Sequence, residues 1–242
     1  MNKDIALKNH WSNSDDTEIG LWKDGRIPYL LDEYLMNHHK GIILEAMNDF
    51  HMHTCIRFIP YESKHKYYMY MKKGKKYSTY PGINVVNNKT EVVLDLDYEH
   101  ETKRNKTKIK TQTKMERLRA IRHELAHVVG LFHEHQRPDR DNFIETIQKS
   151  CSCTLLINNS DWNCNPLTKI SYFSMNKNIR NPIVTIVDTN ISEWFNHVVD
   201  QESITFYPDC FIQKDSQPMP IVFKYELSNY DIQKIKKLYN CK

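Results

Sequence analysis

The sequence predicts a single domain of mixed helices and strands, built of two lobes that join near Gly130. Short strand-like runs and one amphipathic helix fill the first half, a well-capped helix ends at Gly130, and a second capped helix closes the chain. With 242 residues, of which 40% are hydrophobic, the chain is long enough for one sizeable core or for one domain of two lobes.

The first half is expected to contain four strands and one helix. Strand-like composition marks residues 26–32 ("RIPYLLD"), 55–61 ("CIRFIPY") and 67–71 ("YYMYM"). In residues 90–98 ("TEVVLDLDY"), apolar side chains alternate with mostly acidic ones, which predicts a strand with one buried face. Between the first two strands, residues 38–54 place apolar side chains at helical spacing. The expected order is therefore strand, helix and then further strands.

Two later helices have clearer boundaries. Thr113 and Glu116 have the spacing of a capping box at the start of one helix, and Gly130 supplies the left-handed residue that ends it. Ser228 and Asp231 form a similar cap before the C-terminal helix.

Charge and hydropathy exclude several classes of partner. The formal net charge of +4 is small for this length, and the lysines gather in residues 64–77 and 102–114 rather than along a helix face. Solvated loops explain these clusters better than a nucleic-acid surface, so no nucleic-acid partner is expected. No run of 18 apolar residues exists, so no membrane span is expected either.

Cysteine usage points to an oxidising compartment. The six cysteines include no CxxC pair, which argues against a cysteine-based zinc knuckle or a thioredoxin-like redox site. Disulfides are the simpler use, and they form in secreted proteins. The opening residues 1–10 lack the apolar core of a signal peptide, so we expect a secreted protein whose leader is absent from this chain.

One stretch, "HELAHVVGLFHEHQRPDRD" at residues 123–141, carries a pattern of metal-binding side chains. His123 and His127 are four residues apart, so a helix stacks them on one face, where both can bind one ion. A glycine then lets the chain reverse, and His133 can return to the same ion as a third ligand. Three histidines with an open position are typical of a catalytic zinc site. Glu124 lies about 100° around the helix, where it can reach a water on the metal.

The alternative is that these are ordinary core or surface histidines in a chain that has 12 of them. A lone HExxH recurs by chance often enough to keep that alternative open. The longer pattern H-E-x-x-H-x-x-G-x-x-H is expected by composition on the order of once in 20,000 such sequences. Chance is therefore a poor explanation, and the spacing predicts a zinc site.

The same stretch resembles the extended zinc signature of the astacin family of metalloendopeptidases, within the metzincins. The resemblance continues in "LWKDGRIPY", "HMHTCIRFIPY" and the terminal "LSNYDIQKIKKLYNC", and it covers about residues 19–145 and 200–241. It implies an α+β, metzincin-type, two-lobed catalytic domain with a twisted, mostly parallel sheet, a backing helix and an active-site helix. The lower lobe would be irregular apart from its C-terminal helix.

The resemblance also implies roles for individual residues. His123, His127 and His133 would bind one zinc ion, and Glu124 would be the general base. Glu124 would take a proton from the zinc-activated water and return it to the leaving amine. Glu134 matches the family residue that pairs with the N-terminus exposed by removal of a propeptide.

Domain boundaries follow from the same resemblance. If Trp22 lies at the family's usual distance from the mature N-terminus, the peptidase domain spans residues 13–242. Residues 1–12 would then be a pro-region remnant or extension. The upper lobe would span residues 13–130 and the lower lobe residues 131–242.

The chain departs from the family in the lower lobe. The family's S-x-M-H-Y stretch has its best counterpart in "SITFY", where Thr205 replaces the methionine and Phe206 the histidine. Tyr207 is retained, and the resemblance implies that it is the further zinc ligand that moves to the oxyanion. The rival "SYFSMNKN" offers Met175 at a spacing closer to the family's but lacks a following tyrosine, so the longer match favours Tyr207. This choice places an irregular insertion at about residues 146–200.

The resemblance implies one disulfide, between Cys55 and Cys241, which would tie the first lobe to the C-terminal helix. The pairing of the other four cysteines stays open, although the first two are too close in sequence to pair comfortably with each other. These four are Cys151, Cys153, Cys164 and Cys210.

We therefore expect a secreted, zinc-dependent endopeptidase of the astacin type, which cleaves extended polypeptide segments along the edge strand of the upper lobe. The main alternative is a catalytically silent relative that binds zinc or a partner, motivated by Thr205, Phe206 and the insertion. The retained Glu124 weighs against that alternative. A cytosolic zinc hydrolase would be favoured only if the cysteines were free thiols.

Overall fold

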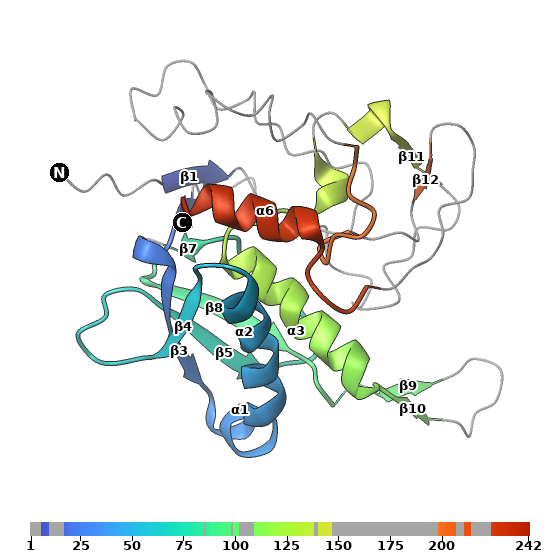
Figure 1. Ribbon diagram of the computed structural model, residues 1–242. Helices are drawn as coiled ribbons and strands as arrows, with labels where there is room; N and C mark the ends of the chain where they lie inside the picture. The colour runs from blue at the N-terminus through green and yellow to red at the C-terminus, as the bar shows by residue number, and fades with distance from the viewer. Residues whose placement is uncertain are drawn as a thin grey trace.

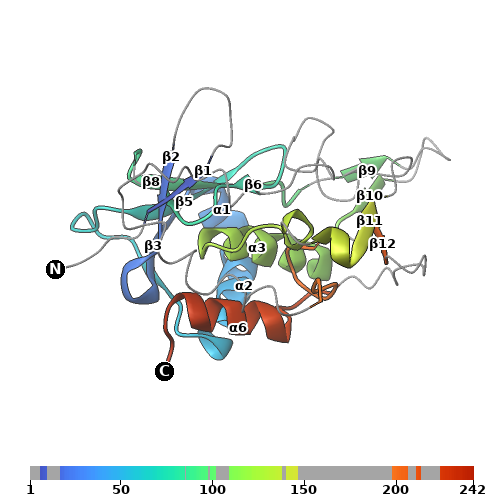
Figure 2. The same ribbon diagram turned by 90° about the horizontal axis from the view of Figure 1, so that it is seen from above.

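The computed structural model describes residues 6–9, 17–84, 86–97, 99–101, 109–137, 140–146, 198–206, 211–213 and 224–242. The main feature of the fold is a five-stranded sheet in the order β4-β3-β5-β8-β6, of which Figure 1 labels the first four strands and Figure 2 labels β6. The first four strands run parallel, and β6 at the edge runs antiparallel to β8. The strands are Arg26–Leu31 (β3), Arg57–Pro60 (β4), Tyr68–Lys73 (β5), Ser78–Thr79 (β6) and Lys89–Leu94 (β8).

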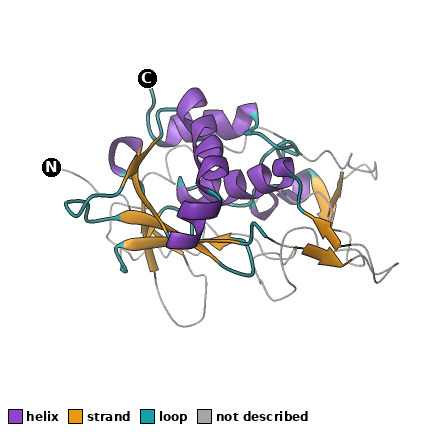
Figure 3. Ribbon diagram, turned by 90° about the horizontal axis from the view of Figure 1, so that it is seen from below, coloured by secondary structure: helices purple, strands orange, loops and turns teal. Residues whose placement is uncertain are grey.

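Helices gather on one face of this sheet (Figure 3). α1 (Glu33–His38) and α2 (Lys40–His53) follow β3, and α2 packs against α3 (Lys114–Val128). In the view of Figure 2, α3 lies between the sheet and α6 (Asn229–Leu238). α3 is therefore the central helix of the fold.

The boundaries of α3 have clear local causes. At its start, Thr113 Oγ1 accepts from the Glu116 N–H at 3.2 Å, and the Glu116 carboxylate accepts from the Thr113 N–H at 2.7 Å, which is the predicted capping box. After its end, Gly130 has a φ of +105°. A Cβ on Gly130 would lie 3.2 Å from the side chains of Leu21 and Leu238, so both backbone conformation and space favour glycine.

The main core lies between the sheet and the helices. Alternate residues of β5 and β8 point into it, and α2 and α3 supply the opposite side. The buried members from these elements are Met69, Met71, Val92, Leu94, Ile43, Ala46, Met47, Phe50, Leu118, Ile121 and Leu125. Burying a large apolar side chain contributes roughly 1.5–3 kcal/mol, so these apolar faces hold the layers together.

α3 is buried on all sides over residues 118–128, whereas a helix at the surface of a fold typically buries only one face. Its polar side chains find partners inside the protein. Arg119 Nη2 donates to the Phe206 carbonyl at 3.4 Å, and Arg122 Nη1 donates to the Tyr225 carbonyl at 2.5 Å. These hydrogen bonds offset the cost of burying polar groups. Because both partners are distant in sequence, helical periodicity could not reveal them.

Cys55 and Cys241 form the predicted disulfide, with their Cα atoms 5.4 Å apart. The bond joins the segment between α2 and β4 to the end of the chain just after α6. The upper part of the fold and the C-terminal helix are therefore covalently connected. The other four cysteines lie outside the described residues.

Three small antiparallel sheets complete the described fold. Their strands are Ala6–Asn9 (β1), Thr17–Gly20 (β2) and Ile83–Asn84 (β7) in the first, Glu99–Glu101 (β9) and Ile109–Thr111 (β10) in the second, and Ile144–Thr146 (β11) and Phe211–Gln213 (β12) in the third. Short 3-10 helices occur at Lys23–Gly25, Glu134–Gln136 and Arg140–Asn142.

The architecture agrees with the predicted α+β class and its mostly parallel sheet. The strand expected at 90–98 ends earlier, at Leu94, and Leu96 is buried in the following turn. The proposed domain boundaries stay predictions, and β1, which falls in the proposed extension, pairs with β2. Most of the proposed insertion lies outside the described residues. No helix in the described ranges combines the length and apolar character needed to cross a bilayer.

Candidate metal centre

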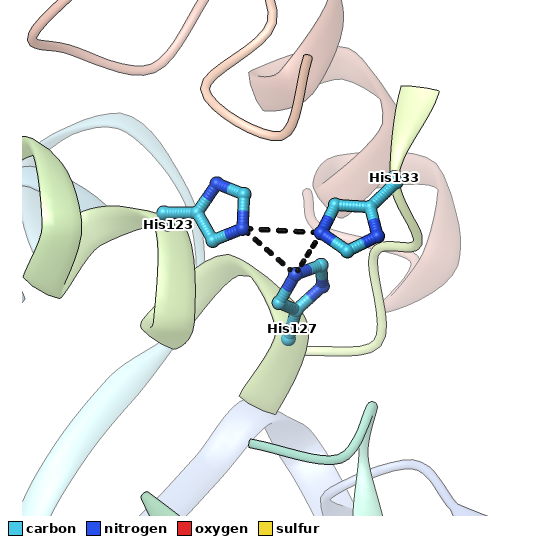
Figure 4. Close-up of side chains that lie close together, drawn as sticks. All are labelled: His123, His127 and His133. Carbon is cyan, nitrogen blue, oxygen red and sulfur yellow. Dashed lines mark hydrogen bonds between the residues drawn. The ribbon is translucent and has the colours of Figure 1, made fainter. Parts of the chain in front are cut away.

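Three imidazole rings meet at the C-terminal end of α3 (Figure 4). His123 and His127 lie one turn apart on α3, and His133 returns from the segment that follows the helix. The Nε2 atoms of His123 and His127 are 3.1 Å apart, and each is 3.2 Å from Nε2 of His133. All three residues are at most 6% exposed. The structure therefore brings together the three histidines that the sequence pattern singles out.

These separations fit one tetrahedral zinc ion. Zinc binds imidazole nitrogen at about 2.0–2.1 Å, and tetrahedral angles then place the ligand nitrogens roughly 3.3 Å apart. Three neutral nitrogens leave one coordination position for water or substrate, as in catalytic zinc sites. Within the described ranges, the three histidines are the one group of histidine, cysteine or acidic side chains with metal-binding geometry.

Hydrogen bonds to the backbone fix the orientation of two of these rings. His123 Nδ1 donates to the Ile204 carbonyl at 2.8 Å, and His127 Nδ1 donates to the Leu131 carbonyl at 2.7 Å. A neutral imidazole has only one N–H, so Nε2 of each ring carries a lone pair. Two lone pairs held 3.1 Å apart repel each other unless a cation lies between them. The rings are thus oriented as metal binding requires.

Burial keeps these rings neutral. It is the main reason why the pKa of His123 lies well below its usual value, and the nearby His127 and Arg119 lower it further. Burial likewise lowers the pKa of His127 to about 4. Because neutral imidazole is the form that binds zinc, protons compete little with the metal near pH 7.

Glu124 follows His123 on α3 and is only 3% exposed. One residue along a helix rotates the side chain by about 100°, so Glu124 lies beside the face that carries His123 and His127. It is not a member of the cluster that could hold the metal. A carboxylate in this place can serve as a base toward a water at the open position without being a ligand.

Glu134, the predicted partner of a mature N-terminus, is buried among charged groups. Its carboxylate accepts three hydrogen bonds, from Arg137 Nη1 (2.8 Å), the Asp200 N–H (3.0 Å) and Lys234 Nζ (2.5 Å). Burial acts to raise the pKa of Glu134, but Lys234 and Arg137 outweigh burial and hold this pKa below its usual value. Residues 10–16 lie outside the described ranges, so the pairing with an N-terminus stays a prediction.

Residues 203–206 approach the triad from the lower part of the fold. All four are buried, and the Ile204 carbonyl accepts from His123. The Thr205 carbonyl accepts from the Glu134 N–H at 3.4 Å. The first four residues of "SITFY" are therefore buried next to the metal centre, and Ile204 contacts one ring of the triad. Tyr207, the fifth, lies outside the described residues, as does Met175 in the rival segment.

Sequence reasoning did not assign His135, Asp231 or Lys234 to this site. The buried ring of His135 stacks on His133 with ring centroids 5.1 Å apart, and burial, aided by Arg140, lowers the pKa of His135 to about 3. His135 is part of the quoted motif, but it falls outside the spacing expected for metal ligands. Asp231 and Lys234 are on α6, and no local pattern connects them to α3.

The parallel sheet, the central helix and the three-histidine centre define a protein of the metzincin class. A family model described as Astacin, a peptidase family, matches residues 14–101 and 99–163, which together make up more than half of the chain. The chain belongs to the astacin family.

Relatives are similar over nearly the whole chain. Zinc metalloproteinase nas-7 of Caenorhabditis elegans is 26% identical over 248 residues, which cover 98% of this chain and 53% of the relative. Zinc metalloproteinase nas-8 of Steinernema carpocapsae is 28% identical, and the match covers 95% of this chain and 47% of the relative. Meprin A subunit beta of Mus musculus is 26% identical, and the match covers 98% of this chain and 29% of the relative. The chain thus spans about half the length of these relatives, or less.

One solved structure supports the fold directly. High choriolytic enzyme 1, a hatching enzyme zinc-protease from Oryzias latipes, matches with a TM-score of 0.62 and 21% identity, covering 98% of this chain and 100% of that chain. This likeness confirms the metzincin-type α+β fold. Zinc metalloproteinases of the astacin family use one zinc ion, and the three-histidine cluster fits that site.

Proposed function

We propose that this chain is a secreted, zinc-dependent endopeptidase that hydrolyses internal bonds of polypeptides. The observation that carries the proposal is the convergence of three buried Nε2 atoms, spaced for one zinc ion, beside the buried Glu124. Membership of the astacin family and relatives named as zinc metalloproteinases support the same class of reaction.

In this proposal, His123, His127 and His133 hold the zinc ion. A bound zinc ion supplies Lewis acidity, which lowers the pKa of a coordinated water to about 7 and polarises the scissile carbonyl. Glu124 accepts a proton from the attacking water and delivers it to the amide nitrogen as the C–N bond breaks. Its burial supports this role, because bulk water has little access to the carboxylate.

Tyr207 is proposed as a further zinc ligand that then donates a hydrogen bond to the developing oxyanion. The position of Ile204 supports this role, because its carbonyl accepts from His123.

An extended polypeptide is the proposed substrate, paired with β6 at the edge of the sheet. β6 contacts α3, and the chain just after β6 reaches the triad, because the Gly82 N–H donates to the His127 carbonyl at 2.9 Å. A peptide paired with this edge would pass close to the metal centre. Recognition through the peptide backbone would then tolerate many side chains.

Secretion is proposed from the chemistry of the cysteines. The disulfide between Cys55 and Cys241 joins the segment between α2 and β4 to the segment just after α6, and structural disulfides persist in oxidising compartments. Mass spectrometry of the protein isolated from its native cells and from their medium, without reduction, would test this part of the proposal. Free thiols at both positions would contradict it and favour a cytosolic enzyme.

The competing function is a catalytically silent relative that binds zinc or a partner. Thr205 and Phe206 motivate it, because they replace the methionine and histidine of the family's stretch and are both buried at the metal centre. The buried Glu124 beside His123 weighs against it. Such a relative would bind zinc fully and still cleave no polypeptide.

The deciding experiment is cleavage of a denatured protein, with zinc content measured on the same samples, by wild type and by Glu124→Gln. Wild type should cleave, a chelator should abolish cleavage, and added zinc should restore it. Glu124→Gln should keep its zinc and lose activity by about 10²-fold or more. Glu202→Gln, which alters an exposed carboxylate, is the matched control and should remain active.

Two results would change the proposal, the first in its function and the second in its mechanism. Wild type loaded with zinc but unable to cleave any polypeptide would favour the silent relative. Normal turnover by zinc-loaded Glu124→Gln would remove Glu124 from the mechanism while leaving the peptidase assignment in place.

A further inference from the structure

Two charged side chains connect α6 to the metal centre. Asp231 and Lys234 are three residues apart on α6 and therefore lie on the same face of the helix. Asp231 is fully buried, and the side chain of Lys234 is mostly buried. Neither belongs to the cluster of possible zinc ligands, so any effect on the metal must pass through other residues.

Asp231 reaches His123 through a single residue, Ile204. Oδ2 of Asp231 accepts from the Ile204 N–H at 2.8 Å, and Oδ1 accepts from Ser203 Oγ at 2.7 Å. The Ile204 carbonyl in turn accepts from His123 Nδ1 at 2.8 Å. The carboxylate on α6 thus holds the residue whose carbonyl sets the orientation of the His123 ring.

Lys234 reaches His133 in a similar way, through Glu134. Lys234 Nζ donates to Oε2 of Glu134 at 2.5 Å, and Glu134 is bonded directly to His133 in the chain. The Glu134 N–H donates to the Thr205 carbonyl at 3.4 Å, which links the two routes. Asp231 and Lys234 therefore act on backbone segments that carry or hold zinc-binding rings.

Helix capping alone does not account for this arrangement. Asp231 does serve the capping box of α6, because Oδ2 also accepts from the Ser228 N–H at 3.1 Å. A cap needs only that contact, whereas Asp231 also binds Ser203 and Ile204, which lie 28 and 27 residues away in the sequence. A buried carboxylate is costly unless it is fully hydrogen-bonded, and apolar packing would dock the helix without that cost.

We propose that Asp231 and Lys234 are positioning residues of the zinc site, through which α6 holds two of the three zinc-binding rings in the geometry that the metal requires. This inference rests on the proposed zinc site. Residues that orient metal ligands typically change metal affinity by about 10- to 100-fold when they are removed. Losing either contact should therefore weaken zinc binding in a protein that is still folded.

The test for Asp231 uses Asp231→Ala and Asp231→Asn. Zinc affinity is measured by competition with a chromophoric chelator, and the visible spectrum of the cobalt-loaded protein reports the coordination geometry. Asp231→Ala should weaken zinc binding about 10- to 100-fold and alter the cobalt spectrum. Asp231→Asn keeps an oxygen for the Ile204 N–H and should recover part of the affinity. If the alanine variant does not fold, a several-fold weakening in Asp231→Asn is the expected result.

Two controls separate positioning from general loosening of α6. Ile235→Ala removes a fully buried core side chain from the same helix, so it should lower the melting temperature but leave the zinc affinity of the folded protein unchanged. Lys236→Gln removes an exposed charge two residues after Lys234 and should bind zinc like wild type. Lys234→Gln removes the same charge from the buried contact and should weaken zinc binding about 10-fold.

Each outcome has a separate meaning. Wild-type affinity and cobalt spectra in Asp231→Asn and Lys234→Gln would overturn the inference while leaving the proposed function intact. An equal loss of affinity in Ile235→Ala would also overturn it, because loosening of the helix would then explain the effect. A wild-type protein that binds no zinc would overturn the proposed function and this inference together.

Discussion

Asp200 carries a buried carboxylate that should make the stability of the fold depend on pH. It is 7% exposed, and it accepts hydrogen bonds from Ser228 Oγ at 2.5 Å and from the Glu202 N–H at 3.0 Å. Burial raises the pKa of Asp200 to about 6; the bond from Ser228 opposes the rise, and the nearby Asp231 adds to it. Asp200→Asn keeps the shape of the side chain and removes the titration.

The size and sign of the effect follow from this pKa. The ordinary value is 3.8, so the shift is about two units, which corresponds to about 3 kcal/mol at about 1.4 kcal/mol per unit. Because the pKa is higher in the folded state than in the unfolded state, the fold favours the protonated carboxyl. Its stabilising contribution is fully present below a pH of about 4 and is lost as the pH rises through about 6.

Urea unfolding of zinc-free wild type and Asp200→Asn between about pH 4 and pH 8 measures this effect, with zinc removed so that metal release does not contribute. The free energy of unfolding of the variant, relative to that of wild type, should rise by up to about 3 kcal/mol as the pH rises from about 4 to about 7. Glu202→Gln removes a charge from a nearby exposed carboxylate, which pairs with Lys224, and reports the effect of losing one surface charge. A difference between Asp200→Asn and wild type that stays constant over this range, or that falls as the pH rises, would refute the reasoning.

Three further predictions test other parts of the molecule. Replacing Cys55 and Cys241 together by serine should lower the free energy of unfolding by roughly 5 kcal/mol, because the disulfide joins residues 186 positions apart; a loss below about 1 kcal/mol in urea unfolding would contradict this. Gly130→Ala should lower the free energy of unfolding by at least about 1 kcal/mol, measured by thermal unfolding, because the φ of Gly130 is +105° and the new Cβ would crowd Leu21 and Leu238. Gly41→Ala, which has open space around it in α2, should be neutral or stabilising by up to about 1 kcal/mol. Tyr207→Phe should lower kcat about 10²- to 10³-fold with little change in zinc content. An unchanged kcat would favour the rival segment that contains Met175.

Local patterns in the sequence were enough to predict much of this molecule. The capping box of α3 depends on two residues three positions apart, and the histidine pair on one face of α3 depends on helical spacing. The third histidine needed only a reversal at Gly130, where the φ of +105° is one that glycine adopts readily. Short-range spacing therefore specifies the metal centre almost completely.

Long-range pairings were not accessible in the same way. Strand composition marks where strands lie but not which strands are neighbours, and only the family resemblance implied a mostly parallel sheet. Asp231 was expected only as a helix cap, because its partners Ser203 and Ile204 are 28 and 27 residues away. The contact between Lys234 and Glu134 spans 100 residues, and no periodic pattern connects them.

The most direct test of the central claim is the zinc content of purified protein, measured by mass spectrometry of the metal for wild type and for alanine variants of the triad. Wild type should hold one zinc ion per chain, and His123→Ala, His127→Ala and His133→Ala should each lose most of it, because three imidazoles share one ion. His135→Phe changes the neighbouring buried histidine outside the triad and should keep its zinc. Folded wild type without stoichiometric zinc, or full zinc content in any of the three alanine variants, would contradict the assignment of this metal centre.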